Sequence, residues 1–242
     1  MYRDVTTATV TYVTEREKLQ SYLPDPFEVG EEATISVSYG LNRDIDWLAG
    51  RSYNIISVSA SVFFNGKVDK LVGDYTLVLW ENLTDPILPG REMQGMPKIY
   101  ADIPDSEVIN NYLSAEASHF GTRFLQMTIE DIEPLDGTKI ASIQEARKDK
   151  DHWMGWRYIP NVGGVGSAIS EPTLFPIEST ITRISLGIGS LKWRRLTWEQ
   201  NPTQFHIVNA LADLPILEYG PASIVRGSNN LYLPDNPPRV IR

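Results

Sequence analysis

The chain of 242 residues contains no cysteine and only 3 histidines. Without thiols it has no disulfide bonds, no thiolate nucleophile and no cysteine-based zinc or iron–sulfur site. The histidines, His119, His152 and His206, lie far apart in sequence, and none has the spacing that places two metal ligands on one helical face. The sequence therefore predicts no metal site.

Basic residues and long apolar runs are also scarce. Lys and Arg total 22 against 31 Asp and Glu, a net charge of -9. Such an acidic chain repels a phosphate backbone, so nucleic acid is not an expected partner. There is no apolar run of about 18 residues for a membrane helix and no basic-then-apolar leader at the N-terminus. We therefore expect a cytoplasmic protein with no membrane partner.

The chain is rich instead in stretches with the alternation and β-branched or aromatic composition typical of strands. These stretches are Thr6–Thr14, Thr34–Tyr39, Ser57–Phe64, Tyr75–Trp80, Arg123–Ile129, Lys139–Gln144 and Thr180–Leu186. Neither an internal repeat nor a linker-like composition shift interrupts them. The sequence predicts one domain over residues 1–242, of α+β class and mostly antiparallel β.

Two helices are predicted among these strands. Thr14 to Glu17 reads as a capping box for a short helix that stops at Pro24. Asn201 is the expected cap of a second helix, with Pro202 as its first residue, ending before Pro215.

The segment Gly90-Arg91-Glu92-Met93-Gln94-Gly95-Met96-Pro97-Lys98-Ile99 carries the main chemical signal. Its lysine stands between apolar residues, directly after a predicted strand and a turn. An ammonium group held in an apolar pocket loses hydration, which lowers its pKa and leaves a neutral amine that attacks carbonyl groups. Lys98 is therefore a candidate Schiff-base nucleophile, although a lysine after proline is more often a surface residue.

This segment resembles the G-R-E-x-x-G-x-P-K motif of the acetoacetate decarboxylase-like superfamily, whose Schiff-base lysine comes last. Further similar stretches run along nearly the whole chain: Tyr12-Val13-Thr14, Leu23-Pro24-Asp25-Pro26-Phe27, Phe64-Asn65-Gly66, Gly73-Asp74-Tyr75, Ile159-Pro160-Asn161 and Leu211-Ala212-Asp213-Leu214-Pro215. The resemblance implies a mostly antiparallel fold around a cone-shaped β-barrel, an apolar active-site cavity, a homo-oligomer, no cofactor, and Lys98 as the iminium-forming residue. Acetoacetate decarboxylase is itself a known example of such an activated lysine.

The chain departs from the decarboxylase pattern at three places. Ile99 stands where decarboxylases have a second lysine, and Ile55 stands where, two residues after Tyr53, they have a catalytic glutamate. A second family glutamate falls within residues 36–38, which contain no carboxylate. Arg3 matches the early active-site arginine only with a small gap. These differences disfavour decarboxylation of a 3-oxo acid.

Other members of the superfamily keep the lysine, lack that glutamate, and condense pyruvate with aldehydes before losing water. They are similar to this chain in a glutamine four residues before the lysine, here Gln94, and a tyrosine near the C-terminus, for which Tyr232 is the candidate. The resemblance implies that Gln94 binds a substrate oxygen and Tyr232 passes a proton to the departing hydroxyl. The alternatives are a turn-stabilising amide and a surface tyrosine.

Arg91 and Glu92 are interpreted first as a charge pair that shapes the turn, and alternatively Arg91 binds a substrate carboxylate. Met96, with Arg3, completes the candidate substrate-binding set. Three functions follow: an aldolase-dehydratase acting on a 2-oxo acid and an aldehyde, a 3-oxo acid decarboxylase, and a non-catalytic binder of carbonyl compounds. The first is the predicted function.

Overall fold

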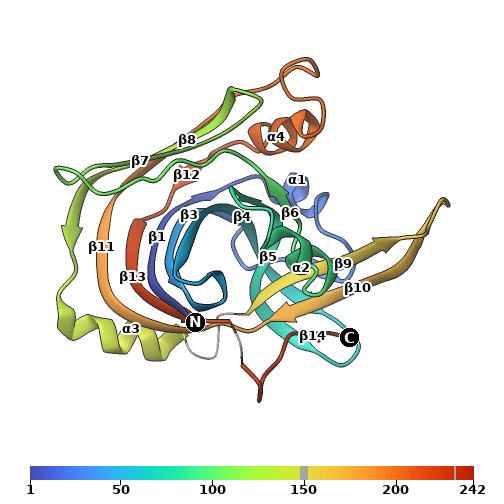
Figure 1. The fold of residues 1–242 in the computed structure, drawn as a ribbon, viewed down its shortest axis with the longest axis horizontal. Coiled ribbons are helices and arrows are strands. Elements are labelled where there is room, and N and C mark those ends of the chain that lie inside the picture. Colours follow the sequence, from blue (N-terminus) through green and yellow to red (C-terminus); the bar gives the residue numbers. More distant parts are fainter. Residues whose placement is uncertain (148–151, 232) are drawn as a thin grey trace.

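The protein is mostly β-strand. The computed structural model in Figure 1 describes residues 1–147, 152–231 and 233–242. The strands are β1 (Tyr2–Val13), β2 (Phe27–Val29), β3 (Thr34–Ile45), β4 (Arg51–Asn65), β5 (Lys70–Glu81), β6 (Lys98–Tyr100), β7 (Leu113–His119), β8 (Thr122–Pro134), β9 (Trp153–Pro160), β10 (Ser167–Phe175), β11 (Glu178–Trp193), β12 (Glu218–Tyr219), β13 (Ala222–Asn230) and β14 (Arg239–Val240). The helices are α1 (Arg16–Gln20), α2 (Ile87–Glu92), α3 (Ile140–Arg147) and α4 (Phe205–Ala212), with short 3-10 turns η1 (Asp46–Leu48) and η2 (Gly137–Lys139).

All strands join one mixed sheet that curls around itself (Figure 1). The hydrogen-bonded order is β14-β10-β9-β5-β4-β3-β1-β13-β11-β8-β7, with β12, β2 and β6 attached at its sides. Most pairs are antiparallel, whereas β5 pairs in parallel with β6 and β9. Strands β14 and β7 are the two ends of this order. Within the described residues they do not pair with each other, so the sheet does not close. The prediction of a mostly antiparallel β-structure with few helices is confirmed, but the cone-shaped β-barrel is not, because the sheet is open.

One face of the sheet forms the hydrophobic core. Val10, Val37, Val58 and Val78 stand opposite one another across β1, β3, β4 and β5, and all four are buried. Paired residues share a face, so this row makes one apolar surface. Helix α4 packs in the same cluster. Burying each such valine contributes about 1.5–3 kcal/mol, which fixes the register of the strands.

The opposite face carries hydroxyl groups in the adjacent row. Thr9, Ser38 and Ser57 are paired across β1, β3 and β4, and the Thr9 and Ser38 hydroxyl oxygens are 2.9 Å apart. Ser57 stands opposite Leu79 of β5, which pairs with Lys98 of β6. Because alternation sends neighbouring residues to opposite faces, the lysine shares its face with hydroxyl groups rather than with the core.

Three local predictions are corrected. The predicted strand Lys139–Gln144 is instead the end of η2 and the start of α3. The Asp136 side chain accepts a hydrogen bond from the backbone N–H of Thr138 and so caps this region. The residues that follow are mostly good helix formers such as alanine, glutamine, glutamate and arginine.

The capping box at Thr14 does not form, since α1 has Glu15 at its N-cap and no side-chain cap bond. Helix α4 begins at Phe205, four residues after the predicted cap. The Asn201 side chain nevertheless accepts a hydrogen bond from the backbone N–H of Gln204, so its capping role is partly retained.

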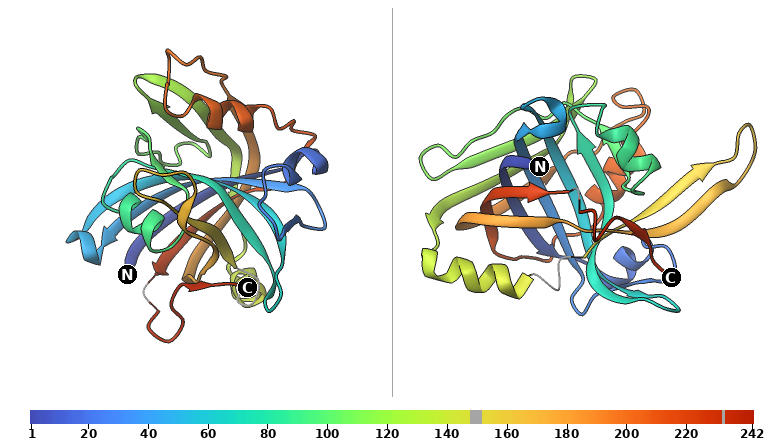
Figure 2. Two further views of the ribbon diagram at one scale, coloured as in Figure 1. Left: turned by 90° about the vertical axis from the view of Figure 1, so that its right-hand side faces the viewer. Right: turned by 60° about the horizontal axis from the view of Figure 1, so that its bottom comes forward.

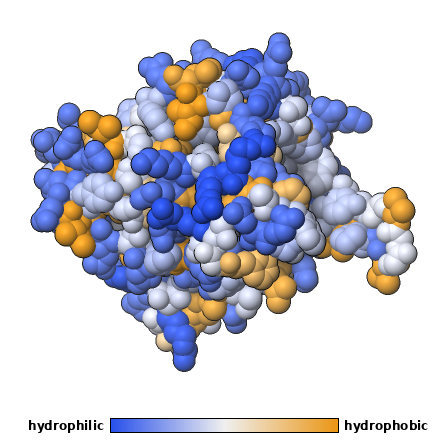
Figure 3. All heavy atoms as spheres, turned by 90° about the horizontal axis from the view of Figure 1, so that it is seen from above, coloured by the Kyte–Doolittle hydropathy of each residue, from blue (hydrophilic) through white to orange (hydrophobic). Residues whose placement is uncertain are grey.

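Strands β9 and β10 extend beyond the body of the molecule as a hairpin arm (Figure 2). Its tip contains the fully exposed Val162 and Val165, and the space-filling view shows hydrophobic atoms at the end of the projection (Figure 3). No helix of the described residues is long and apolar enough to cross a membrane. The same residues contain no cluster of three or more metal-ligating side chains of the His, Cys, Asp and Glu types.

Candidate active site

The motif segment folds as helix α2, a tight turn and the start of β6. Gly95 has φ 75°, a left-handed conformation that glycine adopts without strain. A Cβ at this position would lie 2.6 Å from the backbone nitrogen of Arg157, and the Gly95 carbonyl accepts a hydrogen bond from Trp156. Gly95 therefore lets the turn pack directly on β9, which aims the following residues at the edge of β5.

Gly90 makes room for the lysine. A Cβ on Gly90 would lie 2.3 Å from Cδ, 2.4 Å from Cε and 2.8 Å from Nζ of Lys98. The Lys98 side chain thus runs across α2 at its one residue without a side chain. Gly90 and Lys98, the first and last residues of the motif, are therefore in direct contact.

Lys98 ends beside a buried carboxylate. Its Nζ lies 2.9 Å from Oε1 of Glu81 and donates to the carbonyl oxygen of Pro86 at 3.1 Å. Lys98 is 8% exposed and Glu81 1% exposed. Burial raises the pKa of the Glu81 carboxyl above its usual value, and the neighbouring ammonium opposes this rise only in part.

Two tyrosines form a polar pair close to this carboxylate. The hydroxyl oxygens of Tyr2 and Tyr53 are 3.1 Å apart, and the Trp47 indole N–H donates to the Tyr2 hydroxyl at 3.2 Å. Burial holds the pKa of Tyr53 well above its usual value, and the Tyr2 hydroxyl and the negative charge of Glu81 add to this shift. Both phenols are therefore held in their neutral, proton-donating form.

The remaining motif residues, Arg91, Gln94 and Met96, make different contacts. The Arg91 guanidinium donates to the backbone carbonyl of Lys98 at 2.9 Å. The Gln94 backbone carbonyl accepts from the Thr173 hydroxyl at 2.7 Å, and its side chain is half-buried. Met96 is buried against β9. Among the described residues Arg91 forms no ion pair with Glu92, so Arg91 is tied to the turn by its bond to the Lys98 carbonyl rather than by the expected charge pair.

Of the other two candidates, Arg3 and Tyr232, the structure describes only Arg3. Arg3 makes a bidentate ion pair with Asp46, with nitrogen–oxygen distances of 2.7 and 3.1 Å, and both side chains are exposed. Arg3 has no contact with Lys98 among the described residues. Tyr232 lies outside the described residues.

A cavity of about 1020 Å³ opens on the same face of the sheet as Lys98. Its walls include Thr7, Thr9, Thr11 and Ser36, together with residues that follow β10 and β13. Lys98 and Glu81 do not line it. The row of hydroxyl groups described above runs from this cavity to Leu79, the partner of Lys98 in β6.

Glu81 is the site residue that sequence reasoning missed. The predicted strand ends at Trp80, whereas β5 continues for one more residue. Alternation along this strand puts Leu77, Leu79 and Glu81 on one face, so a strand extended by one residue would have placed a carboxylate there. In the sheet Glu81 stands directly opposite Ile55, the position where decarboxylases have a glutamate. The decarboxylase pattern expects a glutamate at position 55 of β4, and this chain has instead a carboxylate on the neighbouring strand β5, at Glu81.

Comparison with known proteins relates this architecture to decarboxylases. An acetoacetate decarboxylase of Ralstonia nicotianae is 27% identical over 211 residues, which are 86% of this chain and 76% of that protein. The crystal structure of acetoacetate decarboxylase from Legionella pneumophila superposes with a TM-score of 0.78 at 19% identity, covering 100% of this chain and 86% of the other. The enduracididine biosynthesis enzyme MppR complexed with pyruvate has a TM-score of 0.72 at 13% identity, covering 98% of this chain and 88% of the other. Both structural matches concern the fold.

The sequence profile of the acetoacetate decarboxylase family matches residues 1–227, nearly the whole chain. Members of this family are enzymes that act on small oxo acids, and the profile match spans the motif, Lys98 and the strand that carries Glu81. The chain belongs to the acetoacetate decarboxylase family.

Proposed function

We propose that this protein is a Schiff-base-forming lyase in which Lys98 condenses with the ketone of a small oxo acid. The observation that carries the proposal is the buried Lys98 amine, which is held across Gly90 next to Glu81. A buried ion pair costs desolvation energy and is often no more stabilising than apolar residues of the same volume. Such pairs in an otherwise well-packed fold are candidates for function rather than for stability.

For the reaction we propose the condensation of pyruvate with an aldehyde, followed by loss of water. The Lys98 amine adds to the ketone and water leaves, which gives an iminium ion. The iminium withdraws electrons, so the methyl group loses a proton and becomes an enamine carbon. This carbon adds to the aldehyde, the new alcohol eliminates water, and hydrolysis releases an unsaturated 2-oxo acid and free Lys98. Ile55 and Ile99, which depart from the decarboxylase pattern, support this reaction, and MppR is a protein of the same fold that binds pyruvate.

Within this proposal Gln94 hydrogen-bonds a substrate oxygen and Tyr232 gives a proton to the departing hydroxyl. Met96 closes one side of the site. We assign Arg91 to the turn, because its guanidinium already holds the Lys98 carbonyl. Arg3 remains a proposed ligand of the substrate carboxylate, on condition that it exchanges its exposed partner for the substrate.

Decarboxylation of a 3-oxo acid is the second candidate, and Glu81 favours it. A carboxylate beside the iminium nitrogen repels a substrate carboxylate, and this repulsion is strong in a buried site. The relative that is 27% identical is an acetoacetate decarboxylase. Loss of CO₂ from the iminium of acetoacetate leads to an equivalent enamine, so both candidates share the chemistry of Lys98.

Borohydride trapping separates these functions. The protein is incubated with pyruvate or with acetoacetate, reduced, and analysed by intact mass and peptide mapping. A pyruvate adduct on Lys98 that keeps its carboxylate, together with an unsaturated 2-oxo acid as product when an aldehyde is added, supports the condensation. An acetoacetate adduct that has lost CO₂, without condensation product, supports decarboxylation.

Two variants complete the experiment. Lys98→Ala removes the amine and is expected to abolish trapping, whereas Lys192→Ala changes an exposed lysine of β11 and serves as the matched control. Trapping that persists in Lys98→Ala contradicts the assignment of the nucleophile. If neither ketone is trapped on the wild-type protein, the Schiff-base proposal is wrong for these substrates and non-catalytic carbonyl binding takes its place.

A further inference from the structure

The position of Glu81 places its carboxylate at the reacting atom. Glu81 is the last residue of β5, and Lys98 pairs with Leu79 two residues earlier in the same strand. Residues two apart in a strand lie on the same face, so both side chains extend from one face of the sheet. The resulting distance of 2.9 Å between Oε1 and Nζ is within the range for direct proton transfer.

The second oxygen of this carboxylate differs from the first in its surroundings. Oε2 of Glu81 is buried and has no hydrogen-bond partner among the described residues. A buried carboxylate oxygen without a donor is costly, so a merely structural ion pair leaves this oxygen unexplained. Lys98, in contrast, uses two of its three ammonium donors on Oε1 and the Pro86 carbonyl. The vacant acceptor next to the nucleophile is suited to the proton of a substrate.

We propose that Glu81 is the acid–base catalyst of this site, which carries each proton that Schiff-base and enamine formation at Lys98 require. This inference rests on the proposed function of Lys98, but it holds for either of the two candidate reactions, since both pass through an enamine. It assigns a catalytic role to a residue outside the motif, on the neighbouring strand.

The steps balance as follows. One proton moves from the Lys98 ammonium to Glu81, and the lone pair of the amine forms a C–N bond while the C=O pair moves to oxygen. Glu81 protonates that oxygen, takes a proton from the nitrogen, and returns it to the hydroxyl, which leaves as water when the C=N bond forms. The Glu81 carboxylate then takes a proton from the methyl carbon, and the C–H electron pair becomes the C=C bond of the enamine. Decarboxylation reaches the enamine by C–C cleavage, in which the electron pair of the broken bond becomes the C=C bond and CO₂ leaves. The Glu81 carboxylate then takes a proton from solvent water and passes it to the enamine carbon, which gives the iminium of the product.

The burial of Glu81 suits this work. A general base is most effective when its pKa lies near the working pH, and burial raises the pKa of this carboxyl from its usual value. The neutral phenols of Tyr2 and Tyr53 lie in the same region and add no charge that would compete for the ammonium.

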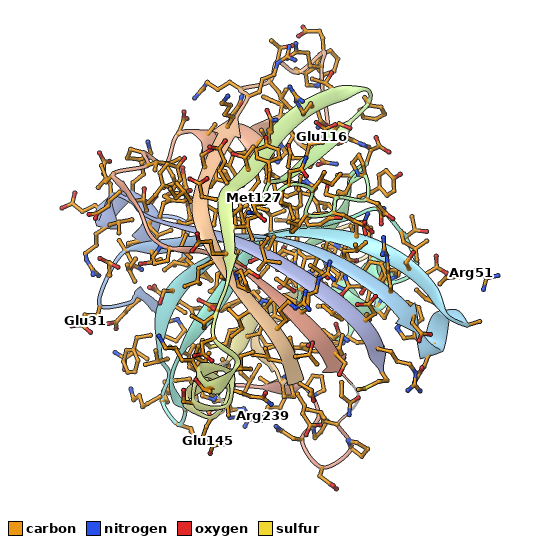
Figure 4. All side chains as sticks on the ribbon, turned by 90° about the vertical axis from the view of Figure 1, so that its left-hand side faces the viewer. Glu31, Arg51, Glu116, Met127, Glu145 and Arg239 are labelled. Atoms are coloured by element: carbon orange, nitrogen blue, oxygen red, sulfur yellow. The ribbon has the colours of Figure 1, made fainter. Side chains whose placement is uncertain are left out.

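The test measures exchange of methyl protons. Pyruvate and acetone are incubated with the protein in D₂O, and the loss of the methyl signal is followed by NMR. Exchange passes through iminium and enamine, and acetone has no carboxylate, so the measurement does not depend on which candidate reaction is correct. We expect Glu81→Gln to slow exchange about 100-fold or more, the usual contribution of a general base. The matched control is Glu116→Gln, which is expected to leave exchange unchanged. It changes a half-buried glutamate of β7, labelled in Figure 4, that pairs with Arg123 and lies far from β5 in the sheet order.

The outcomes distinguish failure of the proposed function of Lys98 from failure of the acid–base role of Glu81. Wild-type protein that neither exchanges these protons nor traps a ketone on Lys98 removes the proposed function and this inference with it. Wild-type activity combined with exchange at the wild-type rate in folded Glu81→Gln overturns the role of Glu81 and leaves Lys98 as the nucleophile. If Glu81→Gln does not fold, Glu81→Asp keeps the charge but withdraws the carboxylate by one methylene, and a loss of roughly ten- to hundredfold is expected from this displacement. Undiminished exchange in Glu81→Asp overturns the inference.

Discussion

Gly90 provides a direct test of how α2 positions the nucleophile. In Gly90→Ala the new Cβ would lie 2.3 Å from Cδ of Lys98 and 2.8 Å from Nζ. Non-bonded carbon atoms approach to about 3.5–4.0 Å, so the lysine side chain must move by roughly 1 Å or more. Its Nζ, now 2.9 Å from Oε1 of Glu81, then leaves hydrogen-bond distance.

The cost to stability is small compared with the cost to activity. Alanine in place of glycine in a helix contributes about 0.5–1 kcal/mol, and overpacking costs about 1–3 kcal/mol. Because the clash is with the end of a flexible side chain, we expect a net destabilisation of roughly 0–2 kcal/mol. A misplacement of about 1 Å in a catalytic group reduces the rate on the order of 100-fold, and we expect this loss in the rate of borohydride trapping of pyruvate.

The matched control is Gly137→Ala in η2, where a Cβ would meet no atom within 4 Å. Urea unfolding gives the stability of both variants, and time-resolved intact mass gives the trapping rate. Trapping by Gly90→Ala at the wild-type rate, with unchanged stability, would refute the argument that Gly90 sets the position of Lys98.

Three further predictions concern stability and binding. Trp80→Phe removes the indole N–H that donates to Oε1 of Gln204 at 2.8 Å, and leaving this buried oxygen without a donor should lower the free energy of unfolding by about 1–3 kcal/mol in urea titrations. Arg91→Lys should lower both the melting temperature and the trapping rate through the lost bond to the Lys98 carbonyl, whereas a raised KM for pyruvate with unchanged Tm would favour binding of the substrate carboxylate instead. The guanidinium of Arg239 in β14 holds the pKa of the Asp69 carboxyl below its usual value. Ionised Asp69 therefore stabilises the fold above pH about 4, and this contribution is lost as the pH falls through the lowered pKa. Urea midpoints of wild type and Asp69→Asn should therefore differ at neutral pH and converge in acid, and a difference that persists at pH 2 would contradict the assignment.

The proposed acid–base chemistry depends on the carboxylate of Glu81, which lies outside the motif. The comparison of motifs identified Ile55 as a missing glutamate and took this as an argument against decarboxylation. In the sheet, Glu81 stands opposite Ile55 and contacts Lys98. The lack of a glutamate at Ile55 therefore does not decide between the two candidate reactions, whereas the trapping experiment with pyruvate and acetoacetate does.

Local patterns of the sequence determined the class of the fold and the candidate nucleophile. Alternation of valines with threonines and serines in β1, β3 and β4 predicts strands with one apolar face, because each residue in a strand points opposite to its neighbour. The motif from Gly90 to Lys98 identified the lysine by resemblance, and no packing information was needed for this. The strand prediction for Lys139–Gln144 was wrong for a local reason, because so short a stretch with a few apolar residues fits a strand and a helix equally well.

The tertiary structure alone decided what surrounds the lysine. Glu81 meets Lys98 because β6 pairs in parallel with β5, and such pairing between segments 17 residues apart leaves no periodic trace in the sequence. The steric need for Gly90 likewise arises only when the helix and the strand are packed together. Periodicity records which face a residue takes, whereas a charged contact between two strands depends on their register, and register is set by the burial of the whole sheet.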